Sequence, residues 1–275
     1  MDNRTITFIG GGNMARSLIG GLIADGFRAD AIRVSDPSEE QCRSLAQRFG
    51  VTTGQDNLAA IEGANAVVLA VKPQVMRQVA SELGEGLQRS GAVVISIAAG
   101  IREPDLRRWI GAEVPIVRTM PNTPSLVQTG ATGLFANNLV SDQQRDLAES
   151  LMRAVGLVQW LDTEALLDAV TAVSGSGPAY FFLLMEALED AGSRVGLPRE
   201  TARLLVLQTA LGAAKMALES EDDPHTLRRR VTSPGGTTER AINTLEDGDL
   251  RALIEQAVRA AAERAAELGD ELGAQ

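Results

Sequence analysis

The sequence predicts an α/β protein in two parts: a doubly wound domain with a mainly parallel sheet over residues 1–160, and an all-helical domain over residues 161–275. Three observations lead to this prediction. In the first part, short β-rich segments alternate with helical ones, as in a parallel sheet whose strands are joined by helices. A glycine-rich turn directly follows the first β-rich segment. In the second part, alanine- and leucine-rich helical sequence replaces the β-branched segments.

The first part is expected to contain several strands and at least two helices. The strands are expected at residues 5–9, 32–35, 66–71, 92–97 and 115–119, and the helices at 14–25 and 38–49. Two of the strand segments, AVVLAV and AVVISI, are almost continuously apolar. Strands that are apolar on both faces are typical of a sheet covered by helices on both sides. The carboxyl ends of such strands form a ligand-binding crevice.

The second part ends in a long helix, in which apolar residues between Leu250 and Leu268 recur every three or four positions. An uncharged stretch, Ala169–Met185, is interrupted by glycines and a proline and is too short to span a bilayer. We therefore expect a helix buried in protein and no membrane partner. Its most apolar segment, Phe181–Met185, is expected to pack against another subunit in at least a homodimer.

The composition excludes several classes of function. The 275 residues carry a formal net charge of −10, which makes nucleic acid an unfavourable partner. One cysteine, Cys42, and one histidine, His225, exclude an internal disulfide and any multi-cysteine or histidine-rich metal site, so no metal is expected. The N-terminal residues lack the basic segment and apolar core of a signal peptide, which predicts a cytoplasmic protein.

The glycine-rich turn has the sequence FIGGGNMA at residues 8–15 and the pattern G-x-G-x-x-A. Gly10 permits a tight turn, Gly12 lets the backbone approach a pyrophosphate, and Ala15 allows close packing of helix on strand. The N–H groups at the start of the next helix then face the phosphates. Because the pattern lies between a strand and a helix, it predicts a dinucleotide site.

The end of the second strand bears on the choice between NAD and NADP, and the sequence leaves three roles open for it. Asp36 is placed to bind a ribose 2′-hydroxyl, which favours NAD. Ser35, with Arg33 or Arg43 nearby, is the alternative and would hold a 2′-phosphate. A purely structural role is equally open, with the segment Asp36–Ser38 only capping the next helix.

Polar or turn-forming residues also follow three other strands. They are AVKP at 70–73, SIAAG at 96–100 and RTMPNTP at 118–124. Since the carboxyl ends of parallel strands share one edge, these segments are expected to line the nicotinamide side. Ordinary loops use the same residue types, so the three segments are informative mainly together.

The segment SPGGTT at residues 233–238 predicts an anion site in the helical part. Ser233 is a suitable N-cap and Pro234 suits the first helical position. Two glycines in the first helical turn would cost about 1 kcal/mol each, which indicates that a ligand approaches their N–H groups. The alternative is a tight turn between two helices.

Two other features of this part have structural interpretations. The segment SGSGPAY at residues 174–180 is expected to let helices cross closely, and Glu164 is expected from composition alone to be a surface carboxylate.

Together, these residues resemble the pyrroline-5-carboxylate reductase family over essentially the whole chain. The shared motifs are IGGGNMA at 9–15, AVKP at 70–73, SIAAG at 96–100, MPNTP at 120–124, DAVTAVSGSGPAY at 168–180, LGAAKM at 211–216 and SPGGTT at 233–238. The resemblance implies a Rossmann domain, a helical dimerisation domain and assembly into dimers or larger groups of dimers. It also implies NAD(P)H-dependent reduction of 1-pyrroline-5-carboxylate to L-proline, the last step of proline biosynthesis, with NADP(H) favoured and NAD(H) as the other candidate.

The resemblance further implies roles for individual residues. The cofactor-binding positions are Gly10, Gly11, Gly12, Asn13, Met14, Ser35, Asn57, Ala70, Val71, Lys72, Pro73, Ile97, Ala98, Ala99 and Asn122. The substrate-binding positions are Glu164, Ser233, Gly236, Thr237 and Thr238. Arg230 departs from relatives that carry asparagine there and receives no role, and Asp36 is a second departure that leaves the cofactor preference open.

Reduction of a ring imine suits these residues. Hydride adds to C5 (counted as in proline), and a protonated ring nitrogen makes that carbon more electrophilic. Orientation and a hydrogen-bond partner at nitrogen matter more here than a strong base. We expect the N–H groups of 235–238 to hold the carboxylate and the catalytic Thr238 hydroxyl to bind the ring nitrogen.

Two rival functions remain at this stage. A β-hydroxyacid-type dehydrogenase shares the glycine turn but needs a catalytic lysine in its helical domain, and no lysine lies between Gly177 and Glu186. A non-catalytic dinucleotide-binding sensor would have no use for the second small-molecule site that SPGGTT predicts.

Overall fold

The computed structural model describes residues 4–274, which form two compact units. The first unit runs to Ser176 and also includes the chain from Ala261 onward; the second spans Gly177–Ala260.

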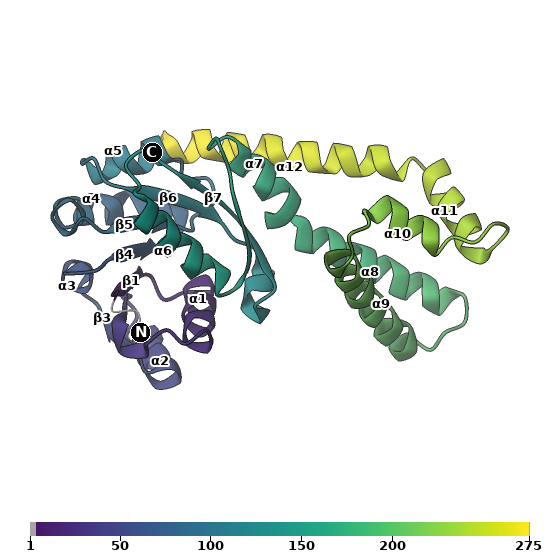
Figure 1. The fold of residues 1–275 in the computed structure, drawn as a ribbon, viewed down its shortest axis with the longest axis horizontal. Helices are drawn as coiled ribbons and strands as arrows, with labels where there is room; N and C mark the ends of the chain where they lie inside the picture. The colour runs from purple at the N-terminus through teal and green to yellow at the C-terminus, as the bar shows by residue number, and fades with distance from the viewer. Residues whose placement is uncertain (1–3, 275) are drawn as a thin grey trace. The chain divides into compact units, whose positions relative to one another are not determined.

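The first unit is built on a mainly parallel eight-stranded sheet with the order β3-β2-β1-β4-β5-β6-β7-β8 (Figure 1). The strands are β1 (Ile6–Ile9), β2 (Ile32–Ser35), β3 (Thr52–Gly54), β4 (Ala66–Leu69), β5 (Val93–Ser96), β6 (Ile116–Met120), β7 (Gly130–Ala136) and β8 (Gly156–Trp160). Within residues 4–274, β6–β7 is the one antiparallel pairing of the sheet, and the other strand pairs are parallel. The predicted doubly wound fold is confirmed, and the strands β3, β7 and β8 are additions that the sequence pattern did not predict.

Helices join these strands. They are α1 (Asn13–Ala24), α2 (Glu39–Phe49), α3 (Asn57–Ile61), α4 (Pro73–Ser90), α5 (Glu103–Ile110), α6 (Asp142–Arg153) and α7 (Leu166–Val170), with the 3₁₀ turns η1 (Ala29–Ala31) and η2 (Thr123–Val127) and the π-helix η3 (Thr171–Gly175). Local signals define several ends: the Ser38 hydroxyl accepts the Gln41 N–H to cap α2, and Ser141 and Gln144 form a capping box on α6.

Both faces of the sheet are buried, as the continuously apolar strands predicted. On one face, Phe8 of β1 packs with Leu18 of α1 and Leu147 of α6. On the other, Ile9 packs with Leu83 of α4 and other apolar residues. Successive side chains of a strand point to opposite faces, so a strand buried on both sides has few positions left for polar residues. Polar chemistry is therefore concentrated at the strand ends.

The second unit is helical, as predicted. It contains α8 (Gly177–Arg194), α9 (Arg199–Glu219), α10 (Pro224–Arg230), α11 (Thr237–Asp247) and the first part of α12 (Leu250–Gly273), whose remainder packs in the first unit. Helices α8 and α9 pack against each other. Among residues 4–274, no helix combines the length and the apolar character needed to cross a membrane.

Candidate functional site

The carboxyl ends of the central strands lie level along one edge of the sheet. Ile9, the last residue of β1, is in register with Ser35 of β2 and Leu69 of β4, and Leu69 is in register with Ser96 of β5. The glycine turn and the AVKP and SIAAG segments leave the sheet from this edge. The strand order reverses direction between β1 and β4, which is where doubly wound sheets bind ligands.

The geometry of the glycine turn fits a dinucleotide. Gly10 has φ +98°, donates its N–H to Ser35 O at 2.8 Å, and comes so close to β4 that an added Cβ would lie 2.7 Å from Ala70 O. Gly12 is the N-cap of α1, and a Cβ placed there would meet no described atom within 4 Å. The first N–H groups of α1, from Asn13 onward, have no partner within their own helix. The turn thus combines close backbone packing on one side with an open approach to helix N–H groups on the other.

Polar contacts at the end of β2 join the turn to α3. The Ser35 hydroxyl donates to Asn57 Oδ1 at 2.8 Å, and Ser35 is buried. The Asp36 carboxylate accepts the N–H of Gly11 and the N–H of Ser38, each at 2.8 Å. Asp36 therefore contacts the glycine turn as well as the start of the next helix, and its role is not limited to capping.

The other predicted cofactor positions lie at the same edge of the sheet and differ in their exposure to solvent. Lys72 is exposed and is the N-cap of α4, which begins at Pro73. Ala98 is buried, whereas Ala99 is exposed. Asn122, after β6, is nearly buried: its amide donates to Ser174 O at 3.0 Å and accepts the Ala131 N–H at 2.9 Å. Asn122 thus holds three segments together with its own side chain.

Glu164 is not the surface carboxylate that composition suggested. Its Oε1 accepts a hydrogen bond from Arg118 Nη1 at 2.5 Å and the backbone N–H of Glu103, the first residue of α5, at 2.6 Å. Both side chains are largely buried, with 8% of Arg118 and 20% of Glu164 exposed. The prediction was wrong because the compensating arginine lies on a distant strand, and burial of a carboxylate requires such a partner.

The segment SPGGTT does not form the helix start that was predicted. Helix α11 begins at Thr237 with Gly236 as its N-cap, so Ser233 and Pro234 precede the helix. Gly235 adopts φ +71°, a left-handed conformation that explains a glycine at this position. The glycines therefore shape the turn before the helix rather than its first turn.

The N–H groups of the segment are also used differently from the expectation. Gly235 donates to Glu239 Oε2 at 2.7 Å, and Gly236 donates to Ser233 O at 3.0 Å. The N–H groups of Thr237 and Thr238, in the first turn of α11, have no partner within the helix. The predicted anion site would therefore use the N–H groups of these two residues.

Ion pairs link the helices on either side of this turn. Arg228 of α10 contacts Glu246 of α11 at 2.7 Å, and Arg251 of α12 contacts the same carboxylate at 2.8 Å. The hydrogen bonds from Arg251 and Arg228 lower the pKa of Glu246 to about 2. This carboxylate therefore stays ionised near neutral pH and joins three helices of the second unit.

Within the chain, the SGSGPAY segment packs against a strand. An added Cβ at Gly175, the last residue of the π-helix η3, would lie 2.7 Å from Met120 Cε of β6, while one at Gly177 would meet nothing described within 4 Å. Within the chain, the close approach at Gly175 is thus between the π-helix and the sheet, and the predicted close crossing of helices stays a prediction. No pattern in the sequence predicts the π-helix, a conformation that often occurs near functional sites.

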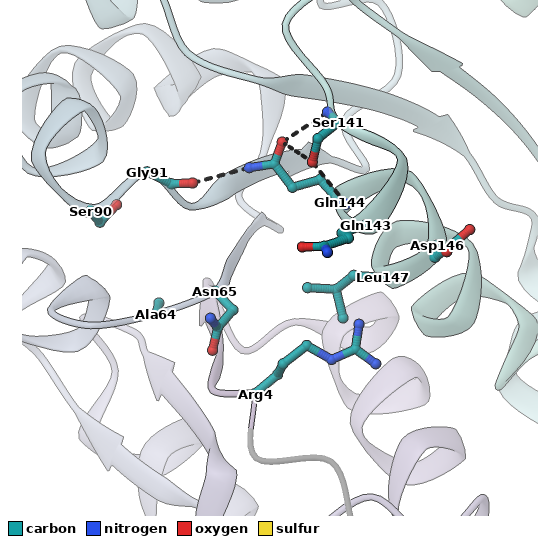
Figure 2. A pocket seen from close by; sticks show the side chains of 10 residues that line it. All are labelled: Arg4, Ala64, Asn65, Ser90, Gly91, Ser141, Gln143, Gln144, Asp146 and Leu147. Atoms are coloured by element: carbon teal, nitrogen blue, oxygen red, sulfur yellow. Dashed lines mark hydrogen bonds between the residues drawn. The ribbon is translucent and has the colours of Figure 1, made fainter.

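A separate pocket of about 580 Å³ lies at the opposite edge of the sheet (Figure 2). Its lining includes Asn65, directly before β4, and Gly91, shortly before β5, so it faces the amino ends of the strands. Gln144 from α6 crosses it and donates to Gly91 O at 3.1 Å. Because doubly wound sheets bind cofactors at their carboxyl ends, this pocket is not the candidate site.

The doubly wound fold and the glycine turn at its strand edge define an oxidoreductase that uses a nicotinamide dinucleotide. A family model described as NADP oxidoreductase, coenzyme F420-dependent, matches residues 5–100, and one described as pyrroline-5-carboxylate reductase dimerisation matches residues 164–268.

Relatives and solved structures agree with these matches. The chain is 54% identical to the pyrroline-5-carboxylate reductase of Pseudomonas aeruginosa, over 99% of this chain and 100% of the relative, and 43% identical to that of Vibrio alginolyticus, over 98% of each. A solved Coxiella burnetii pyrroline-5-carboxylate reductase superimposes with a TM-score of 0.95 at 51% identity, covering 97% of this chain and 99% of that one. The Plasmodium falciparum pyrroline carboxylate reductase with NADP bound gives 0.85 at 30% identity, covering 98% and 99%.

The chain belongs to the pyrroline-5-carboxylate reductase family. Membership confirms the predicted enzyme class, and the two rival functions are set aside. The comparisons support NADP(H) as the cofactor, with NAD(H) as the other candidate. The match to the dimerisation model supports self-association through the helical part.

Proposed function

We propose that the chain uses NAD(P)H bound at the strand edge of its first unit to reduce 1-pyrroline-5-carboxylate to L-proline. The observation that carries the substrate half of this proposal is the turn at 233–238. Thr237 and Thr238 begin a helix there, so their N–H groups have no partner within that helix, and both residues carry hydroxyls. This set of groups suits a small carboxylate carrying a neighbouring nitrogen. Such a set, rather than a histidine or a metal, is what an imine reduction requires.

The residues of the turn receive distinct roles in this proposal. The N–H groups of Thr237 and Thr238 bind the substrate carboxylate, and the hydroxyls of Ser233 and Thr237 add neutral donors. Gly236 keeps the approach to these groups free of a side chain. The Thr238 hydroxyl accepts the N–H of the protonated ring nitrogen and so fixes the orientation of the imine.

In this proposal, Glu164 provides a carboxylate for the substrate. Its two hydrogen bonds, to Arg118 and to the Glu103 N–H, are both made by Oε1. Oε2 makes neither of these bonds, and we assign to it the contact of Glu164 with the substrate.

The cofactor positions named from the sequence remain part of the proposal. The turn at Gly10–Met14 would hold the pyrophosphate, and Asn57 would lie at the adenosine ribose. The segments 70–73 and 97–99 would line the nicotinamide.

The bound cofactor supplies a hydride and ends oxidised; the ring imine gains that hydride at carbon and one proton at nitrogen. Because the reaction consumes NAD(P)H, a cofactor of the cell interior, we place the enzyme in the cytoplasm.

The test of the proposed function is steady-state oxidation of NADPH, and separately of NADH, in the presence of 1-pyrroline-5-carboxylate. We expect the loss of nicotinamide absorbance to be matched by formation of proline, with kcat/KM of at least about 10⁴ M⁻¹s⁻¹ for the imine. Cofactor binding without turnover would contradict the substrate assignment, and failure to bind either dinucleotide would contradict the cofactor site.

The apolar segment 181–184 of α8 is the proposed dimer contact. Phe181, Phe182, Leu183 and Leu184 are between 55% and 66% exposed in the single chain. Replacing Phe182 with aspartate should weaken self-association at least about tenfold, because burying a charge in an apolar interface is costly. Sedimentation velocity measures this effect.

The control for this experiment is Leu139→Asp, a substitution at an apolar residue that is 41% exposed and lies outside the dimerisation match. It should leave the association unchanged. If Phe182→Asp sediments like the unaltered protein at every concentration, the dimer contact lies elsewhere.

A further inference from the structure

We propose that the carboxyl end of α12 positions the SIAAG segment, residues 96–100, for hydride transfer, with Leu272 and Arg102 as positioning residues. This inference rests on the proposed function, in which residues 97–99 line the nicotinamide. It concerns the conformation of this segment, whereas the pyrophosphate is held by the glycine turn in the proposal.

The hydrogen bonds of the SIAAG segment itself are long. After β5 ends at Ser96, the N–H of Ile97 donates to Leu69 O at 3.3 Å, and the N–H of Ala98 donates to Ser96 Oγ at 3.4 Å. A typical N–H···O bond measures about 2.9 Å. Gly100 then adopts φ +76°. The backbone of the segment is thus weakly held by these bonds, and packing against its neighbours contributes to fixing its conformation.

Leucines of α12 provide such packing. A Cβ added at Gly100 would lie 2.8 Å from Leu272 Cδ1 and 3.9 Å from Leu268 Cβ, so the Leu272 side chain lies directly against the glycine backbone. Leu272 also packs against the apolar cluster that contains Ala98 and Ile101. The end of α12 therefore contacts the segment at Gly100 and the cluster in which Ala98 is buried.

Arg102, two residues after Gly100, fixes this end of the helix in place. It is the N-cap of α5, and it donates from Nη1 to Asp270 Oδ1 at 2.6 Å and from Nη2 to Ala266 O at 2.9 Å. One guanidinium thus bonds to a side chain and to the backbone of α12. Any movement of α12 away from these positions would break bonds to the residue that follows the SIAAG segment so closely.

Two glycines of α12 receive arginines of α5. Glycine is unfavourable inside a helix, but a Cβ at Gly269 would lie 2.9 Å from Arg102 Nε, so the guanidinium needs this position to be free of a side chain. Arg108 donates to the carbonyl oxygen of Gly273, the last residue of α12, at 2.6 Å. A cation at the carboxyl end of a helix stabilises its unpaired carbonyl groups. These contacts keep Leu272, which lies between the two glycines, in position.

The test compares Leu272→Ala with Leu272→Met, which keeps most of the side-chain volume. NADPH bound to the protein is mixed rapidly with 1-pyrroline-5-carboxylate, and the loss of nicotinamide absorbance in a single turnover gives the rate of hydride transfer. Leu272→Ala should lower this rate about tenfold, because a small displacement of a reacting group is costly in rate. The dissociation constant of NADPH should change less than about twofold. Leu272→Met should keep most of the rate.

Arg102→Gln tests the same positioning without shortening an apolar side chain. It removes the bidentate contact with α12 and should lower the rate of hydride transfer about threefold. The matched control is Arg264→Gln, because Arg264 also pairs with acidic residues of α12, Glu267 and Glu271, but lies on that helix itself. The control should change neither the rate nor the NADPH affinity. Arg102→Gln carries the test if thermal unfolding shows that Leu272→Ala does not fold.

Two further measurements need no turnover. In the protein without cofactor, hydrogen exchange of the amides at 97–100 should be faster in Leu272→Ala than in Leu272→Met. With NADPH bound and no imine present, the emission maximum of the nicotinamide should move toward that of the free cofactor in Leu272→Ala, because a displaced segment shields the ring less from water.

The outcomes separate this inference from the proposed function. If Leu272→Ala and Arg102→Gln transfer hydride at the unaltered rate, or lose rate and NADPH affinity in equal measure, the end of α12 has only a structural role and the inference is wrong. If the unaltered protein binds NADPH but does not reduce the imine, the proposed function fails. The emission and exchange measurements then still decide whether α12 positions the segment.

Discussion

Replacing Thr238 with alanine is expected to lower kcat for the imine about 10- to 100-fold, with a much smaller change in KM. The variant removes the proposed hydrogen bond to the ring nitrogen, and a hydrogen bond to a charged group contributes about 1.5 to 3 kcal/mol. The carboxylate contacts remain, because they are made by backbone N–H groups that alanine also has. Initial rates over a range of imine concentrations, with saturating cofactor, separate the two parameters.

Three variants make this result specific. Thr238→Ser keeps the hydroxyl and should recover most of the activity, whereas Thr238→Val keeps the shape and should behave like alanine. Thr244→Val is the control, because Thr244 is an exposed threonine of the same helix whose hydroxyl bonds to Arg240 O. An unchanged kcat in Thr238→Ala, or equal losses in Thr238→Ser and Thr238→Val, would show that the hydroxyl does not act on the reacting nitrogen.

The central strands were predictable because they are buried on both faces and their sequences are therefore almost continuously apolar. Segments such as 66–71 are apolar at nearly every position, and helices cover both faces of the sheet in the structure. Strand β3 lacks this signal: it has three residues, Thr52–Gly54, that are exposed or half-buried. Strand β8 was missed for a related reason, since only Val158 of its residues is buried. Strands at the edges of a sheet carry weaker patterns than those at its centre.

The candidate site was predictable where local geometry determines it. The G-x-G-x-x-A pattern marks a turn whose conformation depends on its own residues and on the adjoining strands. The environment of Glu164 depends instead on Arg118, 46 residues away in the sequence, and no local pattern reports that pairing. The start of α11 was misplaced because Ser-Pro satisfies the usual rules for a helix start, while the left-handed Gly235 and its bond to Glu239 delay the helix to Thr237.

A hydrogen bond between Gly235 and Glu239 stabilises the turn at 233–238 within the chain. The Glu239 carboxylate accepts the Gly235 N–H, as the third residue of a helix does in a capping box, although here the bond reaches the residue before the N-cap. The bond gives the N–H group of Gly235, a residue in the left-handed conformation, a hydrogen-bond acceptor. The proposed substrate carboxylate would therefore use the N–H groups of Thr237 and Thr238, which lie within the first helical turn.

Alanine at Gly10 is expected to reduce both stability and cofactor affinity, whereas alanine at Gly12 should reduce cofactor affinity alone. At Gly10, the backbone φ of +98° and the 2.7 Å approach of a Cβ to Ala70 O impose strain that we expect to cost about 2 kcal/mol or more. At Gly12, φ is −67° and an added Cβ meets no described atom within 4 Å, so the fold should accept alanine with little change in stability. The methyl group would instead occupy the open space that the pyrophosphate is proposed to approach.

Denaturant unfolding and direct titration with NADPH together test this pair of variants. Gly10→Ala should shift the unfolding midpoint down and weaken NADPH more than tenfold, since the strained turn moves the first N–H groups of α1. Gly12→Ala should keep the midpoint and still lose about tenfold in affinity. A Gly12→Ala protein that binds NADPH normally would mean that the pyrophosphate does not pass over this turn, and the cofactor would then have to enter the strand edge from the side of the 70–73 segment. Because Gly12→Ala is expected to fold normally, this measurement tests the cofactor site independently of stability.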